Sequence, residues 1–349
     1  MPLALTCKAF LELCINKNGG TMKWKTGPVD SINKLQWALL NGYTLSEGTK
    51  HSAAYGGHFE VLQWLRANGC DWDTWTCAHA AKGGHLEVLQ WLRANGCDWD
   101  TWTCAYAASG GHLEVLQWAR DNGCEWDVDT CLAAARGGHL AVLQWLHSNG
   151  CPWCDMTCEG AAENGDLAML QWARAQNPPC PWNGRTCAAA ASKGHLAVLQ
   201  WLHSNGCPWS DMTSMSAAMG GQLAVLQWVH ANGLNLHSHL CSTAAENGDL
   251  AMLQWLRANG CEWDFASCKY AAKNGHFEVL RWLRAQKPPC PWNAGVCATV
   301  AEEGRLDVLQ WLRGQKPKCP WDARTTEAAR LHRHVEVLEW ARANGCRES

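Results

Sequence analysis

Apolar residues recur along the chain in blocks whose spacing fits short helices. In the stretch 73–99, which reads DTWTCAHAAKGGHLEVLQWLRANGCDW, the segment His85–Asn95 carries apolar residues at Leu86, Val88, Leu89, Trp91 and Leu92. These five positions cover an arc too wide for a helix with a single buried face. We therefore expect a helix over His85–Asn95 that packs against neighbours on two sides.

A shorter helix is predicted just before it, over Thr76–Ala81. Thr76 is a suitable N-cap, and the alanines of this segment are strong helix formers that allow close backbone approach. Gly83-Gly84 ends this helix and Asn95-Gly96 ends the next, because these residues readily adopt the left-handed conformation of a helix C-terminus. A helix pair this small cannot bury its own apolar surface, so copies of it must stack.

The same helical hairpin pattern repeats along almost the whole chain. The tryptophan of a recurring Leu-Gln-Trp motif, or of a close equivalent, falls at Trp37, Trp64, Trp91, Trp118, Trp145, Trp172, Trp201, Trp228, Trp255, Trp282, Trp311 and Trp340. Successive intervals are 27 residues, apart from three intervals of 29 residues. Each longer interval contains a proline-bearing loop, at 176–180, 286–290 or 315–319. Length alone suggests two domains, but this periodicity predicts one continuous array.

Three segments of the unit resemble the ankyrin repeat. Thr-Cys-Ala-x-Ala-Ala, Gly-His-Leu-Glu-Val-Leu-Gln and Asn-Gly-Cys-x-Trp are similar to T-P-L-H-x-A-A, G-H-L-E-V-V and A-G-A-D-V of that family, over roughly residues 30–346. The resemblance implies an all-α helical repeat solenoid. The unit is about six residues shorter than the standard ankyrin unit, mainly in the loop that forms a β-hairpin finger in the family. We therefore expect shortened or absent fingers.

The resemblance divides the chain into a cap and an array. Residues 1–45 are expected to form a degenerate N-terminal capping repeat, with a first helix at Leu5–Cys14 and a second over Val29–Trp37. Residues 46–349 are expected to form the ankyrin-like array of about eleven units. The last unit carries Arg330 where alanine is usual, as expected of a C-terminal cap that meets water.

The composition indicates that one packing environment has been copied many times. The chain holds 24 Trp and 21 Cys but only 4 Phe and 4 Tyr. A net charge of -3 provides no basic field for nucleic acid or for an anionic membrane. No run approaches the ~18 apolar residues of a membrane span, and the start of the chain is a poor signal peptide. An odd cysteine count then favours reduced thiols and a cytoplasmic location, with the nucleus as the alternative.

The cysteines occupy two repeat positions that are usually seven residues apart. The pairs are Cys70 with Cys77, Cys97 with Cys104, Cys124 with Cys131, Cys151 with Cys158, Cys180 with Cys187, Cys261 with Cys268, and Cys290 with Cys297. One hypothesis is a series of metal sites or disulfides, and the other is that each thiol fills a small apolar slot. Ser214 and Leu234 each replace one member while Cys241 remains, and we expect Thr326 to face Cys319. A set of metal ligands would not tolerate these replacements, so they favour the hypothesis that the thiols are packing residues. We therefore expect no bound metal.

One cysteine cluster supports a second functional hypothesis. Cys151-Pro152-Trp153-Cys154 has the spacing of a redox C-x-x-C motif, and Cys158 follows. A thioredoxin-like site needs a βαβ context that a helical array does not offer. Because Cys151 and Cys158 belong to the repeat pattern, only Cys154 is extra. The alternative function is therefore a thiol- or metal-dependent sensor, and Cys154 is the first thiol to test for reactivity.

Histidines that follow the inter-helix glycine do not form a catalytic series. They fall at His58, His85, His112, His139, His195 and His276. Asp166, Gln222, Asp249 and Arg305 occupy the same position in other units, so it requires a polar group that bonds the turn and not a metal ligand. No nucleophile elbow, phosphate-binding loop or zinc-binding helix motif occurs in the chain. We expect no enzymatic activity and no cofactor.

Positions that vary between units are free to face a partner, and three of them fall on the first helix and the loop before it. In ankyrin proteins the residue corresponding to His79 faces a concave groove, so these positions define the expected partner-binding residues. They are Trp75, His79, Lys82, Trp102, Tyr106, Arg136, Met156, Tyr270 and Lys273. Charges along this groove are mixed, which argues against nucleic acid. We expect a monomer that acts as a protein–protein interaction scaffold for a protein partner that the sequence does not identify.

Trp75 and Trp102 are the main evidence for this predicted binding site. Trp72 recurs in nearly every unit and is expected in the core, whereas Trp75 recurs only as Trp102. Exposed tryptophans beside Tyr106 fit an interaction hot spot. Duplication of a single unit with a tolerated tryptophan is the alternative explanation.

Overall fold

The computed structural model describes residues 30–40 and 44–347, and within these ranges the chain is all-α. Each unit is a pair of short antiparallel helices, and none of the described helices is long and apolar enough to cross a bilayer. The helices are α2 (Ile32–Leu40), α3 (Glu47–Tyr55), α4 (Phe59–Ala67), α5 (Thr74–Gly83), α6 (Leu86–Ala94), α7 (Thr101–Gly110), α8 (Leu113–Asp121), α9 (Val128–Arg136), α10 (Leu140–Ser148), α11 (Asp155–Glu163), α12 (Leu167–Arg174), α13 (Gly184–Lys193), α14 (Leu196–Ser204), α15 (Asp211–Met219), α16 (Leu223–Ala231), α17 (Ser238–Asn247), α18 (Leu250–Ala258), α19 (Phe265–Asn274), α20 (Phe277–Ala285), α21 (Ala294–Glu302), α22 (Leu306–Gly314), α23 (Ala323–Leu331) and α24 (Val335–Ala343).

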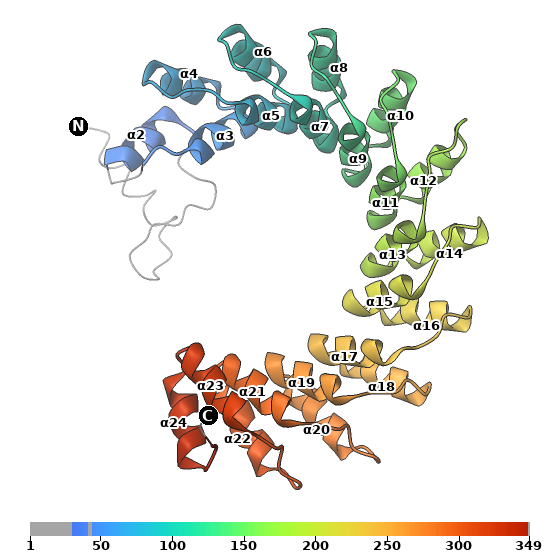
Figure 1. The fold of residues 1–349 in the computed structure, drawn as a ribbon. Helices are drawn as coiled ribbons and strands as arrows, with labels where there is room; N and C mark the ends of the chain where they lie inside the picture. The colour runs from blue at the N-terminus through green and yellow to red at the C-terminus, as the bar shows by residue number, and fades with distance from the viewer. Residues whose placement is uncertain (1–29, 41–43, 348–349) are drawn as a thin grey trace. The chain divides into compact units, whose positions relative to one another are not determined.

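The described chain forms two compact units. One holds α2 to α11 and most of α12, and the other holds α13 to α24. Within each unit the odd-numbered first helices lie side by side along one edge, and the even-numbered second helices lie along the other edge (Figure 1). The links between repeats contain no strand in the described ranges, which confirms the expectation of shortened or absent fingers. The predicted helix Leu5–Cys14 lies outside the described residues.

The two helices of the unit 73–99 form where the sequence predicts them, but the first helix begins earlier. α6 spans Leu86–Ala94, with His85 as its N-cap and Asn95 as its C-cap. The N-cap of α5 is Asp73, not Thr76. The Asp73 carboxylate accepts hydrogen bonds from the backbone N–H of Thr76 at 2.9 Å and from its hydroxyl at 2.8 Å. Because a carboxylate satisfies both donors, the cap lies three residues before the predicted one.

The core of each repeat joins small first-helix residues to branched second-helix residues. In α5, Cys77, Ala78 and Ala81 have no exposed side-chain surface, and neither do Leu89 and Leu92 of α6. Small side chains let the first helices approach one another closely, while the leucines fill the space between the two layers. The sequence pattern thus specifies both layers directly.

The recurring indoles bridge consecutive repeats edge to face. Trp72, in the loop that closes one repeat, lies 5.9 Å from Trp91 of the next second helix, with an interplanar angle of 75°. Trp99 and Trp118 repeat the contact at 5.7 Å and 69°. Edge-to-face pairs contribute about 1 kcal/mol beyond the area they bury. These indoles lie at the joints and are half-buried, so the expectation that Trp72 belongs to the core is met only in part.

At several joints, a histidine of one repeat bonds the end of the preceding first helix. The Nε2 atom of His112 donates to the carbonyl of Lys82, at the end of the preceding first helix, over 3.1 Å. His85 and His139 bond the carbonyls of Tyr55 and Ser109 in the same way. The prediction that this position requires a polar group that bonds a turn is therefore confirmed. For these histidines the partner is a carbonyl of the neighbouring repeat, whereas Gln222 at the same position bonds the Gly220 carbonyl of its own turn.

A glycine makes room for each of these rings. Gly84 has a left-handed φ of 77°, and a Cβ atom there would lie 2.5 Å from the ring of His112. Gly96 has a similar φ of 79°, but a Cβ atom there would meet nothing within 4 Å. The two positions share the same backbone strain and differ only in the neighbouring histidine.

Gly84→Ala is expected to destabilise the protein more than Gly96→Ala. Gly96→Ala should cost about 1 kcal/mol, because only the left-handed backbone is penalised. Gly84→Ala should cost roughly 2–3 kcal/mol, because displacement of His112 also breaks its bond to the Lys82 carbonyl. Urea unfolding followed by circular dichroism measures both. Equal losses in the two variants would show that the histidine contact does not stabilise the joint.

Candidate functional site

Five of the predicted residues come together on α5 and α7. Trp75, His79 and Lys82 lie on α5, and Trp102 and Tyr106 lie on α7. The rings of Trp75 and Trp102 stack with centroids 6.0 Å apart, and Tyr106 lies 5.8 Å from Trp75 and 5.6 Å from His79. The Nζ atom of Lys82 lies 5.0 Å from the centre of the Tyr106 ring. We call these five residues the aromatic patch.

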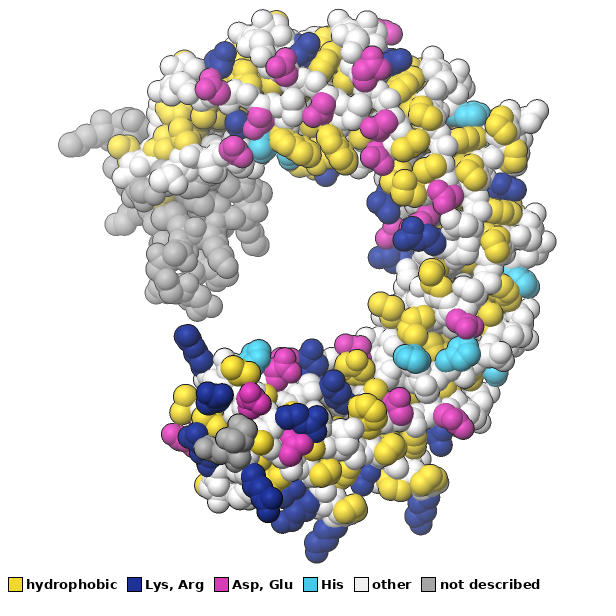
Figure 2. Space-filling view, viewed as in Figure 1, with side chains coloured by type: hydrophobic (Ala, Val, Ile, Leu, Met, Phe, Trp, Pro, Cys, Tyr) yellow, Lys and Arg dark blue, Asp and Glu magenta, His cyan; other side chains and the backbone are white. Residues whose placement is uncertain are grey.

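The two indoles of the patch remain partly exposed because of where the helices begin. Asp100 caps α7 by accepting a hydrogen bond from the backbone N–H of Trp102 at 3.0 Å, so Trp102 lies in the first turn of the helix. Trp75 is 40% exposed and Trp102 is 43% exposed. Figure 2 shows hydrophobic side chains beside histidines over α5 and α7.

The patch continues onto α3 through a stacked pair of imidazoles. His51 of α3 lies parallel to His79, with centroids 4.9 Å apart and an interplanar angle of 3°. The Nδ1–H group of His79 donates to the Trp75 carbonyl over 2.7 Å. His51 was not among the predicted residues, because its position in the repeat usually holds a buried residue such as Ala78. Only the structure shows that this ring extends the patch.

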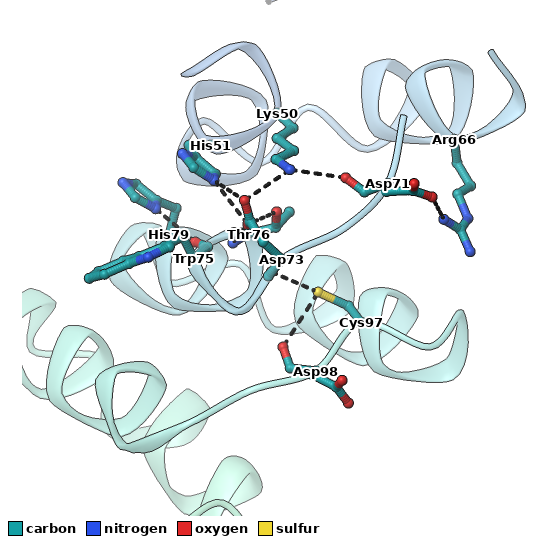
Figure 3. Close-up of polar contacts among 10 residues, drawn as sticks. All are labelled: Lys50, His51, Arg66, Asp71, Asp73, Trp75, Thr76, His79, Cys97 and Asp98. Atoms are coloured by element: carbon teal, nitrogen blue, oxygen red, sulfur yellow. Dashed lines mark hydrogen bonds and ion pairs between the residues drawn. The ribbon is translucent and has the colours of Figure 1, made fainter. Parts of the chain in front are cut away.

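A charged network holds His51 in place (Figure 3). The Asp73 carboxylate accepts from Nε2 of His51 at 2.9 Å and pairs with Nζ of Lys50 at 2.9 Å. Lys50 also donates to the Asp71 carbonyl at 3.0 Å. Partial burial opposes ionisation, but hydrogen bonds from Lys50, Thr76 and His51 outweigh it and hold the pKa of Asp73 well below its usual range. Lys50 occupies the position of the first-helix cysteine in other repeats.

A hollow of about 580 Å³ adjoins the stacked imidazoles. His51, Ser52, Tyr55, His58 and His79 supply its side-chain lining, together with Gly48 and Gly56. Burial lowers the pKa of both His58 and His79. The described residues that line the hollow include no carboxylate.

The remaining predicted residues do not join the patch. Arg136 of α9 pairs with Glu163 at 3.7 Å, and Met156 lies half-buried on α11. Tyr270 and Lys273 belong to α19, in the other compact unit. Lys273 pairs there with Glu303 at 3.5 Å. The variable positions thus supply several separate surfaces, of which one is rich in aromatic side chains.

Where a repeat holds both cysteines, they pair within that repeat and not across its boundary. Cys77 shares a hydrogen bond with Cys97, which lies 20 residues later, and the Cys97 thiol donates to the Asp73 carbonyl at 3.3 Å. The expected pairing of cysteines seven residues apart, such as Cys70 with Cys77, is wrong. The second helix brings the closing loop back over its own first helix, so the loop cysteine meets the first-helix cysteine of the same unit.

This geometry also corrects the interpretation of the replaced cysteines. Ser214 and Leu234 are 20 residues apart and occupy the two cysteine positions of one repeat, so that repeat has lost the pair together. Cys241 instead shares a hydrogen bond with Cys261. Thr326 bonds the Arg347 carbonyl and does not face Cys319, whose partner is Cys297.

Most of the described thiols are buried and inaccessible to solvent. Of the 19 cysteines described, all but Cys70 and Cys154 are buried. The hydrogen bond with Cys97 and burial together raise the pKa of Cys77, which disfavours the reactive thiolate. No group of three potential metal ligands is found in the described part of the chain. Cys154 is half-buried at the N-cap of α11.

Comparison with known proteins identifies the repeat. The family model for ankyrin repeats (many copies) matches residues 51–93, 77–120 and 104–147. This part of the chain therefore belongs to the ankyrin repeat family, and the later 27-residue units form the same helical hairpins. Among solved structures, the human ASB11 ankyrin repeat domain matches with 19% identity over 55% of this chain and 86% of that chain. Its TM-score of 0.29 is too low to support any argument about arrangement. No curated protein sequence matches the chain.

Asp73→Asn is expected to destabilise the protein by about 2 kcal/mol at neutral pH, because it leaves the buried ammonium of Lys50 without a charge partner. Lys50→Cys combined with Asp73→Asn should regain most of this loss, since it recreates the combination of Cys158 with Asn183. The low pKa of Asp73 stabilises the fold above the unfolded value of about 4, and this contribution is lost as the pH falls.

Urea unfolding of the wild type and both variants at about pH 7 and about pH 3 tests this pair. The difference between the wild type and Asp73→Asn should shrink at the lower pH. A constant difference would show that the charge of Asp73 contributes nothing.

Cys70 and Cys154 should react with iodoacetamide before any of the 17 buried cysteines described. Their thiols are partly accessible, whereas the others require local opening of a repeat. Peptide mass mapping after brief labelling gives the order of reaction. Equally fast labelling of a buried pair such as Cys77 and Cys97 would show that burial does not protect these thiols.

Proposed function

We propose that this chain is a non-enzymatic scaffold that binds a protein partner, and that the aromatic patch anchors the partner. Ankyrin repeats are generally protein–protein interaction modules, which supports the class of function. The observation that carries the finer proposal is the stacked and partly exposed pair Trp75 and Trp102. Tryptophan and tyrosine are enriched among the few residues that dominate binding energy.

The repeat itself does not require these two indoles. The equivalent position holds Asp129, Met156, Arg185 and Met212 in later repeats, and those repeats form the same hairpins. A residue that the fold does not need, held in a rigid helix and exposed beside other rings, fits a contact surface better than a packing role. The patch is also fixed by the Asp73 and Asp100 caps, so little ordering is required on binding.

The thiol-sensor hypothesis has less support. Its three cysteines include Cys151 and Cys158, which are buried and paired with other repeat cysteines, so only Cys154 remains partly accessible. A cytoplasmic monomer without cofactor fits the scaffold proposal, because reduced thiols are stable there and the groove needs no second chain.

Trp75→Ala combined with Trp102→Ala should weaken partner capture at least about tenfold, because loss of a hot-spot ring costs about 2 kcal/mol or more. Helicity should stay unchanged, and the melting temperature should shift by only a few degrees. Quantitative mass spectrometry of proteins captured on the immobilised wild type and variant measures the effect. Met212→Ala is the matched control, because this residue occupies the same repeat position in the other unit and is 51% exposed. Undiminished capture by the double variant would refute the site.

A further inference from the structure

We propose that the hollow beside the aromatic patch binds a side-chain carboxylate of the partner, so that the scaffold recognises an acidic extended segment flanked by apolar residues. This inference rests on the proposed function, since it extends the same surface. The hollow has no carboxylate among its described lining residues and is lined by three imidazoles, of His51, His58 and His79. Its chemistry therefore complements a negative charge.

The hydrogen bonds of His51 and His79 leave one nitrogen of each ring available. Nε2 of His51 is bonded to Asp73, and Nδ1 of His79 is bonded to the Trp75 carbonyl. Figure 3 shows that the other nitrogen of each ring points away from these partners. When an imidazole takes up a proton, its second nitrogen becomes a donor, and a carboxylate oxygen is the acceptor that it bonds most strongly.

The charged groups near these imidazoles leave no carboxylate free to pair with a protonated ring. The charged and titratable groups around His79 are Asp73 and His51 on one side, Lys82 on its own helix, and the Tyr106 ring on α7. Asp73 is already committed to Lys50, Thr76 and His51. Around His58 the charged and titratable groups are Asp30, Lys34 and His85. Burial keeps the pKa of His79 low, so an incoming carboxylate supplies the charge partner that its protonated form lacks.

The position of the hollow favours an acidic side chain in the middle of the partner's segment over one at its end. Tyr55 lines the hollow, and His79 connects it to Tyr106 and the stacked indoles. Aromatic rings therefore belong both to the hollow, at Tyr55, and to the adjoining patch. A partner segment that crosses from Tyr55 to Trp75 places apolar residues on the rings and its acidic side chain between them.

The sign of the pH dependence follows from the imidazoles. Binding a carboxylate favours protonated histidine, so affinity must rise as the pH falls through the histidine range and level off above it. We expect binding to be about threefold to tenfold tighter at about pH 6 than at about pH 8, because a charge-assisted hydrogen bond replaces a neutral one. Replacing the acidic residue by its amide should abolish this dependence.

The test selects peptides from a random display library, with members about twelve residues long, on the immobilised full chain at about pH 6. The strongest binder is then synthesised with each Glu or Asp in turn replaced by Gln or Asn, and fluorescence anisotropy measures its affinity at both pH values. The variant is His51→Gln with His79→Gln, which keeps donors for Asp73 and the Trp75 carbonyl but removes two of the three imidazoles of the hollow. His239→Gln, at an exposed histidine of the other unit, is the control.

Enrichment of acidic residues, with a pH dependence that is clearly weaker in the double histidine variant and unchanged in the control, is the expected result. Failure to enrich any binder, or equal affinity for the acid and amide peptides, would overturn the inference. The aromatic variant separates the two proposals. If Trp75→Ala with Trp102→Ala abolishes binding while the histidine variant changes nothing, the patch stands and the carboxylate site fails. If the histidine variant abolishes binding while Trp75→Ala with Trp102→Ala changes nothing, the carboxylate site stands and the aromatic anchor fails.

Discussion

The structure depends on carbonyl groups that one repeat exposes and the next repeat satisfies. The last turn of every first helix leaves carbonyls without a partner inside the helix. At successive joints, the carbonyls of Tyr55, Lys82 and Ser109 are bonded by histidines from the following repeat. An isolated hairpin would leave these groups to solvent and its apolar layers uncovered. The donor arrives only when the next repeat is in place, so hydrogen bonding and apolar burial impose the same requirement for stacking.

Tryptophan and cysteine stabilise two different sets of contacts, one between repeats and one within a repeat. The indoles act between repeats, as in the edge-to-face contact of Trp72 with Trp91. The thiols act within a repeat, where Cys97 ties the closing loop to the N-cap carbonyl of Asp73. A shortened loop explains both roles, because without a finger the closing segment must be held close to its own first helix. The same closeness lets the loop indole reach the neighbouring hairpin. The unusual composition follows from this geometry.

The sequence predicted the helices well because periodicity and glycine position are local features. The five residues of the aromatic patch stand out in the sequence because the repeat leaves their positions free, and the structure brings them together, but their role in binding stays a prediction. The sequence could not predict the cysteine partners, since spacing along the chain does not say which way a loop folds back. It also missed His51 and the network around Lys50. Their importance comes from a contact with Asp73 of the next repeat, and no regular spacing indicates that contact.

Asp73 links the stability of the fold to the proposed surface. Its carboxylate caps α5, neutralises Lys50 and fixes the ring of His51, while the carbonyl of the same residue receives the Cys97 thiol. The cap sets where α5 begins, and therefore where the Trp75 ring emerges beside Trp102. A partner would then meet rings that are already ordered by the core, with little side-chain entropy left to lose. Affinity at such a surface would depend on ring burial and charge fit, and little on the total area in contact.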